Sequence, residues 1–228
     1  MAFIIGVDGC KSGWFSIWEN QSGSIQSSIF RNLNDLKNFF KDENHVIIGI
    51  DMPVVLSDVI PRQADQLARK LLSKKASSVF TAPTPEMLEQ PNYEKAAFVS
   101  KRLFGKSMSL QSWYLFPKIK DVQTMIHHEN MNIYEIHPEL SFRAMNNEKV
   151  ILESKKTQEG FNIRNSLLAT HFQHFNFQEV RLQYAKKDVL DDDILDALAV
   201  LWSAKRIQSN EAFFLPQAPE KPNMQIAY

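Results

Sequence analysis

The N-terminal part of the chain alternates short apolar runs with polar turns, a pattern typical of β-strands. Such runs occupy residues 2–8, 14–19, 24–30 and 45–51. They predict four strands, of which the first three follow one another as hairpins and are therefore antiparallel. Asn32 precedes apolar residues with helical spacing, so we expect a helix to begin there, before the fourth strand.

A helical period dominates the rest of the chain. Apolar side chains recur at every third or fourth position in residues 62–75, 92–106, 109–128, 162–176 and 191–206. A fifth strand is predicted at 131–139, which gives the order β-β-β-α-β…β…α and an α/β fold with a mixed five-stranded sheet flanked by helices. We predict one domain over 1–228, with a helical insertion at 54–130 between the fourth and fifth strands and an extended tail at 214–228.

Composition excludes several classes of protein. Of the 228 residues, 44% are apolar, enough for a sizeable core, and no run approaches the roughly 18 apolar residues of a membrane span. Cys10 is the only cysteine, so neither disulfides nor a cysteine-rich zinc site is expected. The N-terminus does not resemble a signal peptide, and a cytoplasmic location is predicted. The 26 basic and 26 acidic side chains cancel, which favours a short or structured substrate over a long duplex.

Carboxylates mark the ends of several apolar elements. Asp8 ends the first predicted strand, Asp51 ends the fourth and Glu135 lies in the fifth, while Asp193 and Asp196 share one face of the last helix. Because parallel strands end at the same edge of a sheet, we expect these groups to converge. Converging like charges need a cation, and ligands that are all oxygen favour Mg²⁺ or Mn²⁺.

Some of these acids have a purely structural alternative. Asp191 and Asp192 stand at a helix start, where acids cap the helix and complement its dipole. Asp51 alone would suit a cap for the turn after its strand. Asp196 is different, because it lies in the second turn among apolar neighbours, and an acid there needs a partner.

Basic side chains provide candidates for substrate binding. His137 follows Glu135 on the same side of its strand and is either a proton shuttle or a hydrogen-bonded structural group. Other positive charges form either a phosphate groove or solvated helix faces. These residues are Lys11, Arg62, Arg69, Lys118, Lys155 and Lys156.

Seven short motifs in fixed order resemble the DUF429 family, which is described as predicted nucleases of the ribonuclease H-like fold. The motifs are "GVDGCKSGW", "IGIDMP", "SSVF", "PKI", "EIHPELSF", "KKTQEG" and "DDDILDALA". The resemblance covers about residues 3–206, and the order of strands and helices deduced above is independently that of the ribonuclease H-like fold. The "DILDALA" segment is also similar to the last helix of RuvC-type resolvases.

The resemblance implies a two-metal phosphodiester hydrolysis that uses Mg²⁺ or Mn²⁺. Asp8 would bridge the ions, Asp51 and either Asp193 or Asp196 would hold one each, and Glu135 or Glu139 would add a ligand. RuvC-type enzymes usually carry a glutamate on the fourth strand, where this chain has Asp51. The expected substrate is a nucleic acid or a small phosphodiester.

Two other functions remain open from the sequence. An actin-like or sugar-kinase-like phosphotransferase or ATPase uses a related sheet, and "DGCKSG" would then hold phosphates through backbone N–H groups. Such kinases normally contain the fold twice, whereas this chain has room for one copy. A non-catalytic binding module is the other alternative, and carboxylates fully engaged by Arg or Lys would favour it.

Overall fold

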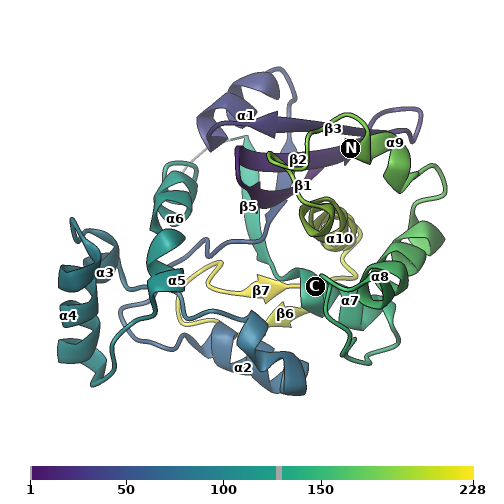
Figure 1. Cartoon of the computed structure of the whole chain (residues 1–228). Helices are drawn as coiled ribbons and strands as arrows, with labels where there is room; N and C mark the ends of the chain where they lie inside the picture. The colour runs from purple at the N-terminus through teal and green to yellow at the C-terminus, as the bar shows by residue number, and fades with distance from the viewer. Residues whose placement is uncertain (1, 127–129) are drawn as a thin grey trace.

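The computed structural model describes residues 2–126 and 130–228 and is built around one mixed β-sheet (Figure 1). Within those residues, the strands are β1 (Phe3–Cys10), β2 (Gly13–Glu19), β3 (Ile25–Phe30), β4 (Val46–Ile50), β5 (Met131–Ile136), β6 (Phe214–Leu215) and β7 (Ile226–Ala227). Their order across the sheet is β3-β2-β1-β4-β5-β7-β6. The three N-terminal strands are antiparallel, β1, β4, β5 and β7 run parallel, and β6 is antiparallel to β7.

Helices connect and cover the strands. In the described part of the chain they are α1 (Leu33–Phe39), α2 (Gln63–Leu72), the 3-10 helix η1 (Ser73–Ser78), α3 (Pro85–Leu88), α4 (Tyr93–Phe104), α5 (Leu110–Tyr114), α6 (Phe116–Gln123), α7 (Pro138–Met145), α8 (Gln158–His171), α9 (Phe177–Arg181) and α10 (Asp191–Gln208). No helix in these described ranges has the length and apolar character needed to traverse a lipid bilayer.

The C-terminal tail corrects the predicted number of strands. All five predicted strands are present, but residues 214–228 also contribute β6 and β7, so the sheet has seven strands in the described residues. Ile226 and Ala227 pair with Glu135 and Ile136 and satisfy backbone groups that β5 would otherwise expose at an edge. A two-residue strand is too short to leave a hydrophobic period in the sequence.

The helices differ from the prediction mainly at prolines. The predicted helix at 109–128 is two helices, α5 and α6, and its last two positions lie outside the described residues, as do 127–129 of the predicted insertion. Helix α7 was not predicted, because Pro138 was interpreted as the end of a strand. Pro138 instead occupies the first turn of α7, where the missing N–H group costs nothing. The predicted cap at Asn32 is confirmed, since its side chain accepts from the N–H of Asp35.

Side-chain alternation decides which face of the sheet each residue reaches. On the central strands, Ile5, Val7 and Ile50 pack in one cluster with α1 and α6. The intervening positions, which include Gly6 and Gly49, face α10. Figure 1 shows α10 crossing the sheet beside β1. Side chains therefore alternate between the two faces. A polar residue near a strand end faces α10 if it lies an even number of residues from Gly6 or Gly49, which we call the same strand parity, and it faces the opposite side otherwise.

Helix α10 lies unusually close to the sheet because two paired glycines leave room for it. Gly6 of β1 and Gly49 of β4 are direct neighbours in the parallel pair. A Cβ atom at Gly6 would stand 2.2 Å from the carbonyl oxygen of Ala197, and one at Gly49 would stand 2.9 Å from Cγ1 of Val200. Both distances are below contact. The backbone of α10 therefore rests directly on β1, and the side chain of Val200 packs into the space that Gly49 leaves on β4.

Substitution of Gly6 by alanine should destabilise the protein through this contact. We expect the free energy of unfolding to fall by about 2–3 kcal/mol, because the added methyl group overpacks a rigid backbone contact. Gly9→Ala is the matched control, since its Cβ would meet only the side chain of Lys118, which can move. We expect it to cost less than about 1 kcal/mol. Urea unfolding of both variants measures the difference, and equal losses would contradict the proposed contact.

Candidate carboxylate site at the sheet edge

Strand parity places two aspartates side by side under α10. Asp8 lies two residues beyond Gly6, and Asp51 lies two residues beyond Gly49, so both continue the face that α10 covers. The N–H group of Asp51 donates to the carbonyl of Val7 at 3.1 Å, which keeps the chain beside β1 after β4 has ended. Asp8 and Asp51 therefore meet at the carboxyl edge of the two central strands.

Helix α10 supplies a third carboxylate, Asp196. It precedes Ala197, which contacts Gly6, and it lies one turn before Val200, which contacts Gly49. This position puts Asp196 above the strand ends, where only 3% of the residue is exposed. One of its oxygens, Oδ1, is buried and has no hydrogen-bond partner among the described residues.

Lys155 carries the positive charge of this cluster. It comes from the segment between α7 and α8, and its Nζ lies 2.5 Å from Oδ2 of Asp196 and 3.3 Å from Oδ2 of Asp192. The ammonium of Lys155 also attracts Asp8 and Asp51. Burial opposes the charged form of Lys155, but the carboxylates around it, above all Asp196, hold its pKa above the ordinary value. One ammonium thus serves several carboxylates.

Burial and mutual repulsion shift the titration of the three aspartates. Burial is the largest cause and raises the pKa of Asp51 to about 7 and that of Asp196 to about 6, with Lys155 opposing both shifts. The pKa of Asp8 is raised well above its ordinary value by burial and then by Asp51 and Asp196. Near neutral pH the cluster therefore holds protons that exposed aspartates would have lost.

Glu135 lies on the opposite face of the sheet from this cluster. Its register partner on β4 is Ile50, so it shares the parity of Ile50 and not that of Asp51. Arg62 donates to both of its oxygens, at 2.8 Å and 2.5 Å, and the N–H group of Val54 donates at 3.1 Å. Arg62 is itself buried, and this ion pair leaves neither partner free for a substrate or a metal.

Three further acids near the site have structural partners. The carboxylate of Asp193 accepts from the N–H of Leu190 at 2.8 Å and caps the start of α10. Glu139 receives two hydrogen bonds from buried Arg164, at 2.7 Å and 2.9 Å. Asp191 pairs with Arg181 and Lys186. The structure thus brings together Asp8, Asp51 and Asp196, and it separates these three from the acids that cap or pair elsewhere.

A cleft of about 920 Å³ opens from the carboxylates toward the helices between β4 and β5. Asp8, Asp51, Lys118, His137 and Lys155 border it near the sheet. Nε2 of His137 lies 3.3 Å from the carbonyl of Ser78, while its Nδ1 is buried without a partner in the described residues. Burial lowers the pKa of His137, which favours the neutral ring.

The remaining predicted basic residues take different positions. Lys118 covers Gly9, lies over the ring of Trp14 and donates to the carbonyl of Gly13, with its pKa lowered by burial. Arg69 borders the far part of the cleft, whereas Lys11 and Lys156 are exposed and do not line it.

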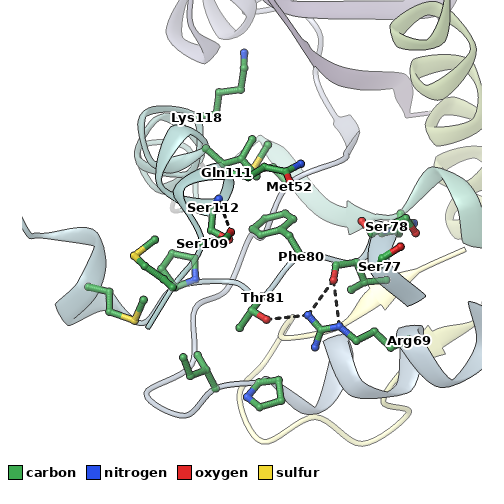
Figure 2. Close-up of a pocket in the computed structure, with 18 of the residues that line it drawn as sticks. Met52, Arg69, Ser77, Ser78, Phe80, Thr81, Ser109, Gln111, Ser112 and Lys118 are labelled. Carbon is green, nitrogen blue, oxygen red and sulfur yellow. Dashed lines mark hydrogen bonds between the residues drawn. The ribbon is translucent and has the colours of Figure 1, made fainter. Parts of the chain in front are cut away.

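The sequence pattern does not identify the residues on the helical side of the cleft. Phe80, Ser109, Gln111 and Ser112 line it, as Figure 2 shows. Phe80 lies in a loop, and the other three lie at the start of α5. The local pattern of each segment does not indicate that the two segments share one cavity.

The donor chemistry of the cluster suits a hard divalent cation. Every candidate ligand is a carboxylate oxygen, and Oδ1 of Asp196 is a buried acceptor without a partner in the described residues. As the side chains stand in residues 2–126 and 130–228, no three acids, histidines or cysteines are grouped closely enough to hold an ion. The ammonium of Lys155 occupies the cluster, so a metal would have to displace it.

These features define an α/β protein with an acidic site at the carboxyl ends of its central parallel strands, covered by its last long helix. The chain belongs to the family described as "Protein of unknown function (DUF429)", which matches residues 6–221. No curated protein and no solved structure matched the chain.

The raised pKa of Asp51 predicts that stability falls with rising pH in metal-free buffer. The folded pKa of about 7 exceeds the ordinary value of 3.8, so the folded protein holds this proton more tightly than the unfolded chain. Its contribution to stability is therefore complete below about pH 4 and is lost as the pH rises to about 7.

The substitution Asp51→Asn should remove the loss of stability that occurs as the pH rises. We expect the variant to exceed the parent in free energy of unfolding at pH 8 by on the order of 2 kcal/mol, and to match it near pH 4. Urea unfolding in EDTA between pH 4 and pH 8 measures this, with Asp42→Asn on the exposed surface as control. A gap that does not depend on pH would refute the shifted titration.

Proposed function

We propose that the protein is a metal-dependent phosphodiester hydrolase of the nuclease type, with a ribonuclease H-like fold. The observation that carries this proposal is the convergence of Asp8, Asp51 and Asp196. Asp8 and Asp51 line one end of a cleft, and behind them a buried oxygen of Asp196 is left without a partner in the described residues. The order β3-β2-β1-β4-β5 and the placement of these acids on β1, after β4 and on α10 support it.

Asp8, Asp51 and Asp196 would hold Mg²⁺ or Mn²⁺. When bound, the ion supplies neutralisation of the carboxylates and of the phosphate, and it lowers the pKa of bound water. The raised pKa values of the three acids mean that they are partly protonated near neutral pH, so cation binding should release protons. Asp193 stays a helix cap in this proposal, and Glu135 stays with Arg62.

The remaining polar groups of the cleft have roles in positioning and proton transfer. Lys118 and Lys155 place two ammonium groups at its charged end, where a phosphate would lie. The carbonyl of Ser78 can only accept, so Nε2 of His137 carries the hydrogen and Nδ1 is left as an acceptor. Its lowered pKa keeps His137 neutral near pH 7, so Nδ1 would accept a proton as a weaker base than an exposed histidine.

A second candidate is a phosphoester-binding module that works without metal. The ion pairs of Lys155 with Asp192 and Asp196 favour it, because they already neutralise part of the cluster. No comparable observation favours the phosphotransferase. In the hairpin between β1 and β2, the N–H of Gly9 donates to Asp8 and that of Ser12 to Asp188, so neither is free for a phosphate.

Removal of the charge of Asp8 or of Asp196 should strongly reduce cleavage. We expect Asp8→Asn and Asp196→Asn to lower Mn²⁺-dependent hydrolysis by about a thousandfold, because each removes a charge that holds the ion. Asp191→Asn is the matched control, since Asp191 lies on the same helix but pairs with Arg181. A screen over single-stranded, duplex, hybrid and dinucleotide substrates measures this, and full activity of Asp8→Asn would refute the assignment.

Lys155→Met tests whether the ammonium competes with metal. We expect Mn²⁺ to bind the variant about tenfold more tightly than the parent, because the carboxylates lose their internal cation. Titration calorimetry measures the affinity, and Lys156→Met, which alters an exposed neighbour, is the control. If neither the parent nor Lys155→Met binds Mn²⁺, the metal-free binding module is the better description.

A further inference from the structure

The cleft changes character as it leaves the carboxylates. Between β4 and β5 its walls include the partly buried apolar side chains of Phe80, Phe104 and Met108. Polar groups from α5 face the same space (Figure 2). A charged end and an aromatic end therefore belong to one continuous cavity of about 920 Å³, within the size range of small-molecule sites.

Phe80 is held in place by a clamp on both of its neighbours. Nε and Nη2 of Arg69 donate to the carbonyl of Val79 at 3.1 Å and 2.9 Å, and Nη2 also donates to Oγ1 of Thr81 at 2.9 Å. Figure 2 shows these bonds below the ring of Phe80, at the chain on either side of it. Because the backbone of Phe80 is held at the wall of the cleft, its ring offers a partly preorganised stacking surface.

The opposite wall offers groups that suit the polar edge of a planar ligand. Gln111 is exposed at the start of α5, borders the cleft and makes no side-chain hydrogen bond within the described residues. Its amide carries both a donor and an acceptor, as the edge of a nucleobase requires. The hydroxyl groups of Ser109 and Ser112 lie 2.8 Å apart beside it.

We propose that this cleft binds one phosphodiester linkage of a single-stranded nucleotide ligand, with an adjoining base on Phe80 and the phosphate toward Lys118 and Lys155. The inference rests on the proposed function for the reaction at the phosphate. A duplex would need a broad basic surface, whereas this chain has no net charge and the ammonium groups of Lys118 and Lys155 lie inside a confined cleft. The ligand is either a free dinucleotide or the end of a single strand.

Calorimetry on the full parent chain tests the proposal, with Ca²⁺ in place of Mn²⁺ so that the metal site is intact and bound ligand is not cleaved. The probes are a dinucleotide, a single-stranded tetranucleotide and a blunt 20-base-pair duplex. Phe80→Leu should weaken binding of the dinucleotide about tenfold through loss of stacking. Phe98→Leu, at an exposed position of α4 outside the cleft, should leave it unchanged.

Further results separate the two ligand sources and the two proposals. Tighter binding of the tetranucleotide than of the dinucleotide identifies the end of a single strand. Gln111→Leu, at an exposed site that folding does not require, should alter the preference among bases.

Absent dinucleotide binding, no effect of Phe80→Leu, or equally tight duplex binding overturns the inference. If binding depends on Phe80 but the parent cleaves no substrate, this inference holds and hydrolysis fails. If the parent cleaves duplex DNA or RNA without dependence on Phe80, hydrolysis holds and this inference fails.

Discussion

The close packing of α10 against two paired glycines is the constraint on which the rest of the structure depends. Gly6 lets the helix backbone rest on β1, and Gly49 leaves room on β4 for the side chains of Val200 and Ala204, so a larger residue at either position would push the helix away. The same contact fixes the height and rotation of the helix above the strand ends. Asp196 is therefore brought to Asp8 and Asp51 by backbone packing, before any interaction among the acids themselves.

Electrostatics oppose the arrangement that packing imposes. Elsewhere, acids are held by the several donors of a guanidinium: Arg62 serves the buried carboxylates of Glu135 and Asp65, and Arg164 donates twice to Glu139. At the strand ends, by contrast, Lys155 is shared by several carboxylates, and the pKa values of Asp51 and Asp196 rise. An excess of buried acid over cation, maintained beside an open cleft, is a feature of functional sites more than of stable cores.

The sequence predicted those parts of the fold and site that depend on local pattern. Strand ends and helix spacing predicted Asp8 and Asp51 at two strand ends and Asp196 on the last helix. The structure places Asp8 two residues before the end of β1, Asp51 one residue after β4 and Asp196 on α10. The face of the sheet that Glu135 would occupy depended on register with β4, which no local pattern encodes, and the structure places it opposite Asp51. Lys155 and the strands of the tail lie in segments without a hydrophobic period, so tertiary contacts alone define their partners.

Helix α2 connects the two ends of the cleft through two arginines that resembled phosphate ligands in the sequence. Arg62 at its start is anchored to Glu135 on β5, and Arg69 holds the segment that carries Phe80. Seven residues separate the arginines, which is about two helical turns or roughly 10 Å. Because one rigid helix carries both anchors, the position of Phe80 is set relative to the sheet edge where Asp51 lies. Both arginines therefore shape the cleft by holding segments of its walls in place.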